Sequence, residues 1–454
     1  MTLSFPEFAA ALSLAERAAL GAPPSPAAAG ERAQKRLARW RSQAPFDRDG
    51  YFPRRLAQDG LDEAALLALL GEPPEALAER AGLAASPPDW LREIAETFRL
   101  AVPGAPLPFP AGEPEVHLLR LASPFLQQAE RRLAAAAAEL AAERAAAGRP
   151  LPFAPATVVP LLLAGLGNQL RWTVTRAAVL ELNVARLEGR ITGETPEERF
   201  AAFVERLGDP AEALAILRTY PVLARQLAVR IGWFADAGIE FLRRLTHDWD
   251  AILAAFGPAG DPGPLTEVAT GAGDRHRGGR TVFLLTFASG WRLVYKPRPM
   301  AIAAHFQDLL RWLDDRGFAP GFRKLGVLAR DGYGWMEFAA PSPCETRDEV
   351  RRFYQRMGGY LALLYALDAS DVHYENLIAA GEHPLLVDLE SIVQPRVSPH
   401  PDTGADWIAN QILSESVLRI GLLPQRFWGG AGGGVDLSGL GSPDGQLTPD
   451  RYPN

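Results

Sequence analysis

Three polar residues in the last quarter of the sequence have the types and the spacing of a magnesium–nucleotide site. Asp371 and Asn376 stand five positions apart in the segment Asp-Val-His-Tyr-Glu-Asn, and Asp388 follows twelve positions later. In phosphotransfer sites with this spacing, the first Asp accepts the proton of the attacking hydroxyl group. The Asn and the second Asp bind the Mg²⁺ ions that bridge the phosphates of ATP. We therefore predict a phosphotransfer site in which Asp371 is catalytic and Asn376 and Asp388 bind magnesium.

The residues between these positions also carry information. Residues 377–387 have the pattern of two short strands around a turn, which would place Asp388 beside Asn376. His373 would either orient the substrate or Asp371, or only satisfy the backbone of the loop. The alternative for the whole segment is a charged turn between a helix and a hairpin, because one Asp and one Asn at this spacing are common by chance.

A predicted hairpin upstream supplies a candidate phosphate-binding lysine. Residues 281–287 and 291–296 read as its two strands, and Lys296 ends the second one. A compact ammonium group suits binding of the α- and β-phosphates of ATP, and the alternative is a surface lysine. The helix predicted at 302–316 offers no glutamate to orient this lysine, so the usual Lys–Glu ion pair is not expected. Its acidic residues are Asp308, Asp314 and Asp315.

The glycine-rich loop expected over the phosphates is incomplete. Gly271-Ala-Gly273 is followed by Asp274 and His276, before a second glycine pair. Simple phosphate binding does not require an Asp and a His at this place. They are therefore either part of the chemistry or polar residues of a mobile loop, and the residue types alone leave both interpretations open.

The region that precedes these motifs is predicted to be helical. Leu61–Leu70 has apolar residues at helical spacing and ends at a glycine. A second helix is predicted over Ser123–Ala147. Thr195–Glu198 is a capping box with proline at the first helical position, and Asp209–Glu212 repeats the device.

After this region the pattern changes to strands. A hairpin and a helix are followed by strands at 324–328 and 332–338, a long helix at 349–367, the Asp371 loop and a second hairpin. This is the order of a kinase small lobe and the start of a large lobe. We predict an α+β protein in three domains: residues 1–255, a helical N-terminal region; residues 256–345, a β-rich small lobe; and residues 346–454, a partial large lobe.

Composition narrows the class of protein. The formal net charge of −7 argues against nucleic acid as a partner. The single cysteine, Cys344, excludes a disulfide framework and a Cys-rich zinc site within this chain. The N-terminus lacks the pattern of a signal peptide, and no uncharged apolar stretch is long enough for a transmembrane segment. We expect a cytoplasmic protein that uses ATP and Mg²⁺ and has no zinc site in this chain.

Several segments together are specific to one family. They include Gly273–Arg280, Leu293–Arg298, Asp371–Glu390 and Ser416–Pro424, and further ones are Leu180–Gly189, Tyr220–Arg225, Tyr333–Trp335 and Asp436–Gly441. As a set they resemble the dehydratase domain of class II lanthipeptide synthetases, the LanM type. The resemblance extends over nearly the whole chain.

The resemblance implies a lipid-kinase-like fold behind a helical N-terminal region. It also implies an enzyme that phosphorylates Ser and Thr in the core of a leader-bearing precursor peptide with ATP, and then eliminates phosphate to leave dehydroalanine or dehydrobutyrine. By this resemblance the ATP and phosphorylation site would comprise Lys296, Asp371, His373, Asn376 and Asp388. Asp274 and His276 would belong to the phosphate-loop region that elimination shares, where charge develops on a leaving phosphate and an enolate.

The sequence also departs from the family. Family members are much longer, and this sequence ends before the Arg and Thr used for elimination and before the zinc-dependent cyclase. We therefore expect a truncated or split synthetase whose dehydration is incomplete, with a separate polypeptide as the partner that supplies the missing part. Two alternatives stay open. One is a fragment that binds precursor peptide without catalysis. The other is a small-molecule kinase of the aminoglycoside or choline type, a class that shares the Asp-x-His-x-x-Asn pattern but lacks the long helical region.

Overall fold

The computed structural model describes residues 3–21, 29–48, 50–84, 86–109, 112–271, 277–393, 405–429 and 433–441. The chain forms two compact units, one of residues 1–247 with 275–280 and one of residues 248–274 with 281–454. The division falls within the long helix α14 (Pro221–Phe256), whose last turns belong to the second unit. The three domains predicted from the sequence stay a prediction.

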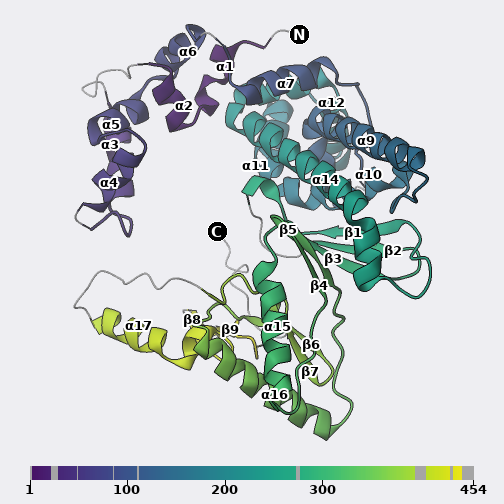
Figure 1. Ribbon diagram of the computed structural model, residues 1–454. Coiled ribbons are helices and arrows are strands. Elements are labelled where there is room, and N and C mark those ends of the chain that lie inside the picture. Colours follow the sequence, from purple (N-terminus) through teal and green to yellow (C-terminus); the bar gives the residue numbers. More distant parts are fainter. Residues whose placement is uncertain are drawn as a thin grey trace. The chain divides into compact units, whose positions relative to one another are not determined.

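The described part of the first unit is helical (Figure 1). Its α-helices before α14 are α1 (Phe5–Phe8), α2 (Leu14–Ala19), α3 (Glu31–Arg41), α4 (Tyr51–Gln58), α5 (Glu63–Gly71), α6 (Pro74–Gly82), α7 (Asp89–Arg99), α8 (Pro114–His117), α9 (Ser123–Ala146), α10 (Pro155–Leu163), α11 (Leu166–Leu187), α12 (Pro196–Leu207) and α13 (Pro210–Thr219). The helical N-terminal region predicted from the sequence is therefore confirmed. Helices α5 and α9 lie within two residues of their predicted bounds.

The capping signals act as local start points for these helices. At α12 the Thr195 hydroxyl accepts a hydrogen bond from the Glu198 N–H at 3.1 Å, and the Glu198 carboxylate accepts one from the Thr195 N–H at 3.3 Å. At α13 Asp209 accepts from the Ala211 N–H at 2.8 Å. The second capping box predicted there is wrong in one respect, because the Glu212 carboxylate pairs with Arg206 at 2.6 Å instead of turning back to the cap.

The second unit contains a five-stranded antiparallel sheet in the order β1-β2-β3-β5-β4. The strands are β1 (Leu265–Thr270), β2 (Phe283–Phe287), β3 (Arg292–Lys296), β4 (Val327–Arg330) and β5 (Tyr333–Glu337). The predicted hairpin is β2–β3, with Phe283 opposite Tyr295. Strand β1 was not predicted individually, because its sequence Leu-Thr-Glu-Val-Ala-Thr alternates only in part and its pairing with β2 contains an irregularity.

Two helices and a second hairpin complete the part of this unit that positions the polar residues. They are α15 (Ala301–Asp315), α16 (Arg347–Ala366), β6 (Leu377–Ala380) and β7 (His383–Leu386). Helix α15 packs against β4 and α16 packs against β7 (Figure 1). One hydrophobic core runs through all of them, with Phe306, Leu310, Tyr360 and Leu385 almost fully buried. The chain is thus an α+β protein with a helical N-terminal region and a small antiparallel sheet, as predicted.

The end of α14 is tied to this sheet by one buried carboxylate. Asp248 is 2% exposed and accepts three hydrogen bonds, from Arg330 Nε at 2.9 Å, from the Tyr333 hydroxyl at 2.9 Å and from Trp335 Nε1 at 2.8 Å. A buried carboxylate that lacked these donors would cost several kcal/mol. The three donors therefore fix the helix end against β4 and β5.

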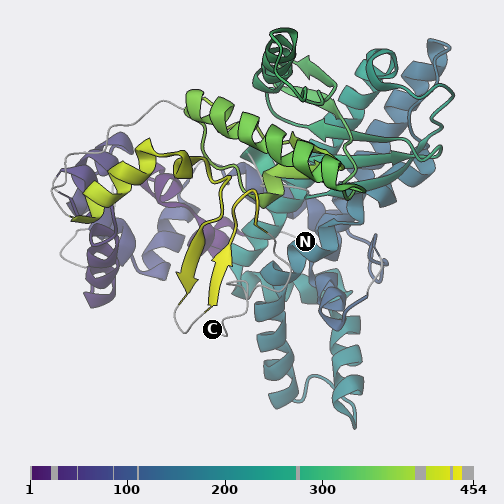
Figure 2. The ribbon, with the colours of Figure 1, turned by 90° about the horizontal axis from the view of Figure 1, so that it is seen from below.

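The last described segment contains α17 (Ala405–Glu415), the short 3-10 helix η6 (Val417–Ile420), and strands β8 (Arg426–Gly429) and β9 (Gly433–Asp436). Strands β8 and β9 form an antiparallel hairpin, which Figure 2 shows as two yellow arrows. Leu437 and Ser438, which follow β9, contact the Asp371 loop.

Candidate nucleotide and phosphotransfer site

The Asp371 loop combines a buried anchor with an exposed polar tip. Val372 is 3% exposed, belongs to the hydrophobic core, and donates its N–H to the carbonyl of Ile420 at 2.8 Å. The neighbouring Asp371 side chain is 70% exposed, and its backbone has φ +62°. A residue other than glycine with positive φ stores strain that the surrounding structure must hold, and such residues concentrate at functional sites. The loop therefore presents the Asp371 carboxylate to solvent from a fixed base.

His373 and Asn376 support this loop from inside. The short 3-10 helix η5 (Tyr374–Asn376) begins after His373, whose Nδ1 accepts from the Glu375 N–H at 3.3 Å. The other ring nitrogen, Nε2, lies 3.9 Å from Asp371 Oδ1. Asn376 Nδ2 lies 3.2 Å from the same Nε2 and donates to the Asp371 carbonyl at 2.8 Å. Asn376 therefore holds the backbone of Asp371, and His373 lies beside its carboxylate.

The segment after α17 packs beside the Asp371 loop. Tyr374 N–H donates to the Leu437 carbonyl at 3.2 Å, and His373 forms a β-bridge with Ser438. Together these elements line a cleft of about 400 Å³. Its lining residues are Asp371, His373, Tyr374, Glu375, Gly421, Gln425, Leu437 and Ser438. The exposed Asp371 carboxylate thus faces a concave space large enough for a side chain of a substrate.

Gly421 is the glycine among these lining residues, and its backbone conformation disfavours a side chain. It has φ +79°, and a Cβ there would lie 3.4 Å from the Val372 nitrogen. We expect Gly421→Ala to lower the free energy of unfolding by about 1–2 kcal/mol and to displace the Asp371 loop. Gly332→Ala is the matched control, because Gly332 has φ +75° but open space around it. Denaturant unfolding and phosphoryl transfer are measured for both variants. Loss of transfer in both variants, or in neither, would contradict this expectation.

A second group of charges lies where β3 and β7 end. Lys296 is 5% exposed, and its ammonium donates to the Val387 carbonyl. Two positions later along the chain, Arg298 Nη2 donates to Asp388 Oδ1 at 2.6 Å, and Arg298 Nη1 donates to Glu390. Among the described residues, Lys296 has no carboxylate partner on the helix that follows. Of the aspartates there, Asp314 pairs with Lys324 and Asp308 with Arg311.

Burial and neighbouring charge shift the pKa values of this group. Burial, reinforced by the charge of Arg298, lowers the pKa of Lys296 to about 8, although Asp388 and Glu390 act in the opposite direction. Burial alone would raise the pKa of Asp388. The charge and hydrogen bond of Arg298, with help from Lys296 and the Glu390 N–H, outweigh it and leave that pKa below its usual value. Asp388 is therefore ionised at neutral pH and can bind a cation.

Val387 joins the two groups. Its N–H donates to the Asn376 carbonyl at 3.0 Å, while its carbonyl accepts from Lys296. A second link runs through Ser391, whose hydroxyl donates to the Ser370 carbonyl at 2.7 Å. The Asp371 loop and the Asp388 turn are thus held together by backbone contacts on both sides.

Next to the Lys296 group lies a second cleft of about 220 Å³. Its lining mixes charged and apolar side chains, as small-molecule sites do. The residues are Lys296, Arg298, Pro299, Met300, Ile302, Ala303, Val387, Leu389 and Glu390.

The site offers two side-chain oxygen atoms that could bind magnesium. Asn376 uses its amide nitrogen for the Asp371 carbonyl, which leaves Oδ1 without a partner among the described residues. The same holds for Oδ2 of Asp388, because Arg298 and the Glu390 N–H both contact Oδ1. No group of three or more His, Cys, Asp or Glu residues could hold a metal within the described ranges. Two protein oxygens suffice for Mg²⁺, which usually keeps several waters and takes the remaining ligands from phosphates.

The structure thus brings together five of the seven predicted site residues: Asp371, His373 and Asn376 in one loop, and Lys296 and Asp388 around Val387. The other two, Asp274 and His276, lie outside the described residues. Sequence reasoning assigned no role to Arg298 or to the wall at Gly421 and Ser438. One signal could have indicated a role for Arg298. It stands two residues after Lys296, and such residues lie on the same side of an extended chain.

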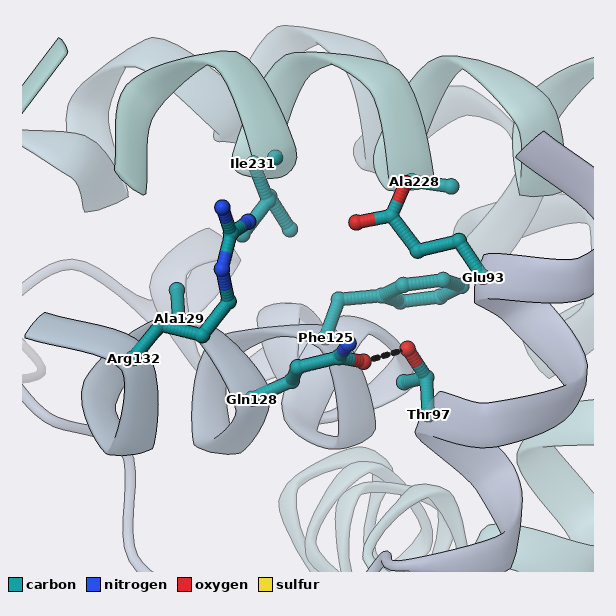
Figure 3. A pocket seen from close by; sticks show the side chains of 9 residues that line it. Glu93, Thr97, Phe125, Gln128, Ala129, Arg132, Ala228 and Ile231 are labelled. Atoms are coloured by element: carbon teal, nitrogen blue, oxygen red, sulfur yellow. Dashed lines mark hydrogen bonds between the residues drawn. The ribbon is translucent and has the colours of Figure 1, made fainter. Parts of the chain in front are cut away.

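A further cavity lies in the first unit and has a different character (Figure 3). Glu93 of α7 and Arg132 of α9 face it, and Thr97 is hydrogen-bonded to Gln128 beside it. Burial raises the pKa of Glu93, against the opposing charge of Arg132. The space inside measures about 10 Å³, enough for about one water molecule. We therefore interpret it as a packing defect with polar walls.

Comparison with known proteins finds one family model and one relative that match this chain. The family model described as "Domain of unknown function (DUF4135)" matches residues 220–454, which contain both clefts. The chain is 26% identical over 282 residues to the lacticin 481/lactococcin biosynthesis protein LcnDR2 of Lactococcus lactis subsp. lactis. The match covers 60% of this chain and 29% of that protein, so the chain spans less than a third of the relative's length.

These similarities confirm the resemblance to class II lanthipeptide synthetases, in which the same domain is found. Among the described residues, no helix combines the length and the apolar character needed to cross a membrane.

Proposed function

We propose that this chain, which belongs to the family described as "Domain of unknown function (DUF4135)", binds Mg-ATP and phosphorylates Ser and Thr side chains of a lanthipeptide precursor peptide. The relative LcnDR2 acts in the biosynthesis of lacticin 481, which supports a peptide that is modified as the substrate. The observation that carries the proposal is Val387, whose backbone contacts both Asn376 and Lys296. Through these contacts the candidate base Asp371, the candidate magnesium ligands and the buried Lys296 would belong to one site.

Each residue has a role in this proposal. Lys296 would bind the α- and β-phosphates of ATP, and Asn376 and Asp388 would hold Mg²⁺. When bound, Mg²⁺ neutralises the phosphate oxygens. In the transfer step the substrate hydroxyl oxygen bonds to the γ-phosphorus, the bond to the bridging oxygen of ADP breaks, and Asp371 takes the hydroxyl proton. His373, whose Nε2 lies 3.9 Å from the Asp371 carboxylate, would orient Asp371 or the substrate.

A second step would complete the dehydration. A base removes the Cα proton of the phosphorylated residue, the Cβ–O bond breaks, and inorganic phosphate leaves with the electron pair, so that dehydroalanine or dehydrobutyrine remains. We assign Asp274 and His276 to this step on the basis of the resemblance alone. The separate polypeptide expected as a partner belongs to the same part of the proposal.

Nucleotide binding is the first test, because it needs no knowledge of the peptide. A ligand that binds only the folded state raises the free energy of unfolding by about 3 kcal/mol at about 100 Kd. We expect Mg-ATP to raise the melting temperature of the wild type and to have no effect on Asp388→Asn. Asp308→Asn is the control, because Asp308 is an exposed partner of Arg311 in the same unit. If Asp388→Asn responds to Mg-ATP as the wild type does, the nucleotide site is wrongly placed.

The substrate class is tested by mass spectrometry. A leader-bearing peptide with Ser and Thr in its core should gain phosphoryl groups, or lose water, in the presence of Mg-ATP. The same peptide without its leader and an aminoglycoside are the comparison substrates. Phosphorylation of the aminoglycoside alone would favour the small-molecule kinase. Binding of the peptide with no change in mass would favour a non-catalytic fragment.

A further inference from the structure

Arg298 binds two carboxylates at the place where the metal is expected. Its side chain is 13% exposed, and its two terminal nitrogens contact different acids, Asp388 at 2.6 Å and Glu390. These acids stand two positions apart on the turn after β7, so that one guanidinium spans the turn. Hydrogen bonds between a guanidinium and carboxylates are among the stronger ones in proteins, because both groups are charged.

The contact concerns the same carboxylate that the proposed function assigns to the cation. Asp388 Oδ1 already accepts from Arg298 and, at 3.4 Å, from the Glu390 N–H. A divalent cation bound to Asp388 would stand next to a fixed positive charge, and Lys296 adds a second one nearby. Repulsion between these charges weakens cation binding unless the guanidinium moves or receives another anionic partner.

We propose that Arg298 competes with the divalent cation for Asp388. A nucleotide phosphate would end this competition by accepting the hydrogen bonds of the Arg298 guanidinium in place of Asp388. This inference rests on the proposed function, because it takes Asp388 as a metal ligand. Arg298 lines the same cleft as Lys296, so a phosphate held by the lysine lies within reach of the arginine. Metal and nucleotide would then bind cooperatively, and metal alone would bind weakly.

The test is the affinity for Mn²⁺ alone, measured on the full chain by calorimetry or by the relaxation of water protons. We expect Arg298→Gln to bind Mn²⁺ about tenfold more tightly than the wild type, because one charged contact of about 1.5 kcal/mol is removed. Its cooperativity between Mn²⁺ and ATP should fall by a similar factor. Arg298→Lys keeps the charge but cannot span both acids, and it should lie between the two.

Arg311→Gln is the matched control, because it removes one positive charge from an exposed pair with Asp308 in the same unit. It should bind Mn²⁺ as the wild type does. Unchanged or weaker Mn²⁺ binding in Arg298→Gln, while Mg-ATP still stabilises the wild type and not Asp388→Asn, would overturn this inference alone and leave Arg298 as a structural support. If Asp388→Asn also binds Mn²⁺ and Mg-ATP normally, the proposed function and this inference both fail.

Discussion

Replacement of Asp371 by Asn should reduce phosphoryl transfer by about 10²–10⁴-fold, the usual contribution of a positioned general base. The amide cannot take the hydroxyl proton, whereas its shape is nearly that of the carboxylate. The fold should persist, because the Asp371 side chain is 70% exposed and Asn tolerates positive φ as well as Asp does. Stability towards denaturant and the Mg-ATP melting shift should therefore stay close to those of the wild type.

The control for this variant is Asp368→Asn. Asp368 also has positive φ, but its carboxylate pairs with Arg419 at 2.9 Å and is not part of the cleft. It should keep phosphoryl transfer, with at most a modest loss of stability. Wild-type transfer rates in Asp371→Asn would remove Asp371 from the chemistry and would turn the search for a base to other residues of the cleft.

The second large effect is expected at Lys296, where stability and function should change in opposite directions. The pKa of about 8 in the folded chain, against 10.5 for an ordinary lysine, corresponds to a penalty of about 3 kcal/mol for the buried ammonium. Lys296→Met removes the charge at nearly constant shape, while the lost hydrogen bond to Val387 costs about 1 kcal/mol. We expect the variant to be more stable than the wild type by about 2 kcal/mol at pH 7, and to show no Mg-ATP melting shift.

The stability gained in Lys296→Met should depend on pH in a defined direction. Because the folded pKa lies below the unfolded one, the penalty is complete below pH 8 and is relieved as the pH rises toward 10.5. The difference in unfolding free energy between Lys296→Met and the wild type should therefore shrink between pH 8 and pH 10. Lys324→Met is the control, because Lys324 pairs with Asp314 and lies outside the cleft. A variant that is less stable at pH 7, or that keeps its nucleotide shift, would contradict the assignment.

Local signals predicted much of this structure. The β2–β3 and β6–β7 hairpins lie where two strands around a turn were predicted, and α15 and α16 lie within two residues of the helices predicted at 302–316 and 349–367. The Asp371 loop was located because its polar residues stand close together in the sequence. Each of these features depends on contacts between residues that are near neighbours along the chain.

The features that were missed depend on distant contacts. Arg298 and Asp388 are 90 positions apart, so nothing in either segment alone indicates their ion pair. The wall at Gly421 and Ser438 is joined to the Asp371 loop by backbone hydrogen bonds, which carry no signal in the side-chain pattern. The acceptor of Lys296 is likewise a main-chain carbonyl, that of Val387. Such details are set by tertiary packing, and the sequence pattern is compatible with other partners.

The buried carboxylate at the end of α14 determines where this protein can be divided. A fragment that begins at residue 256, where the β-rich region was predicted to start, lacks Asp248 and so loses its hydrogen bonds with Trp335 and Tyr333. Arg330 would lose its ion pair with the Asp248 carboxylate. The shortest piece of the chain that retains an intact sheet therefore begins upstream of Asp248, inside a helix that a search for linkers would never choose as a boundary.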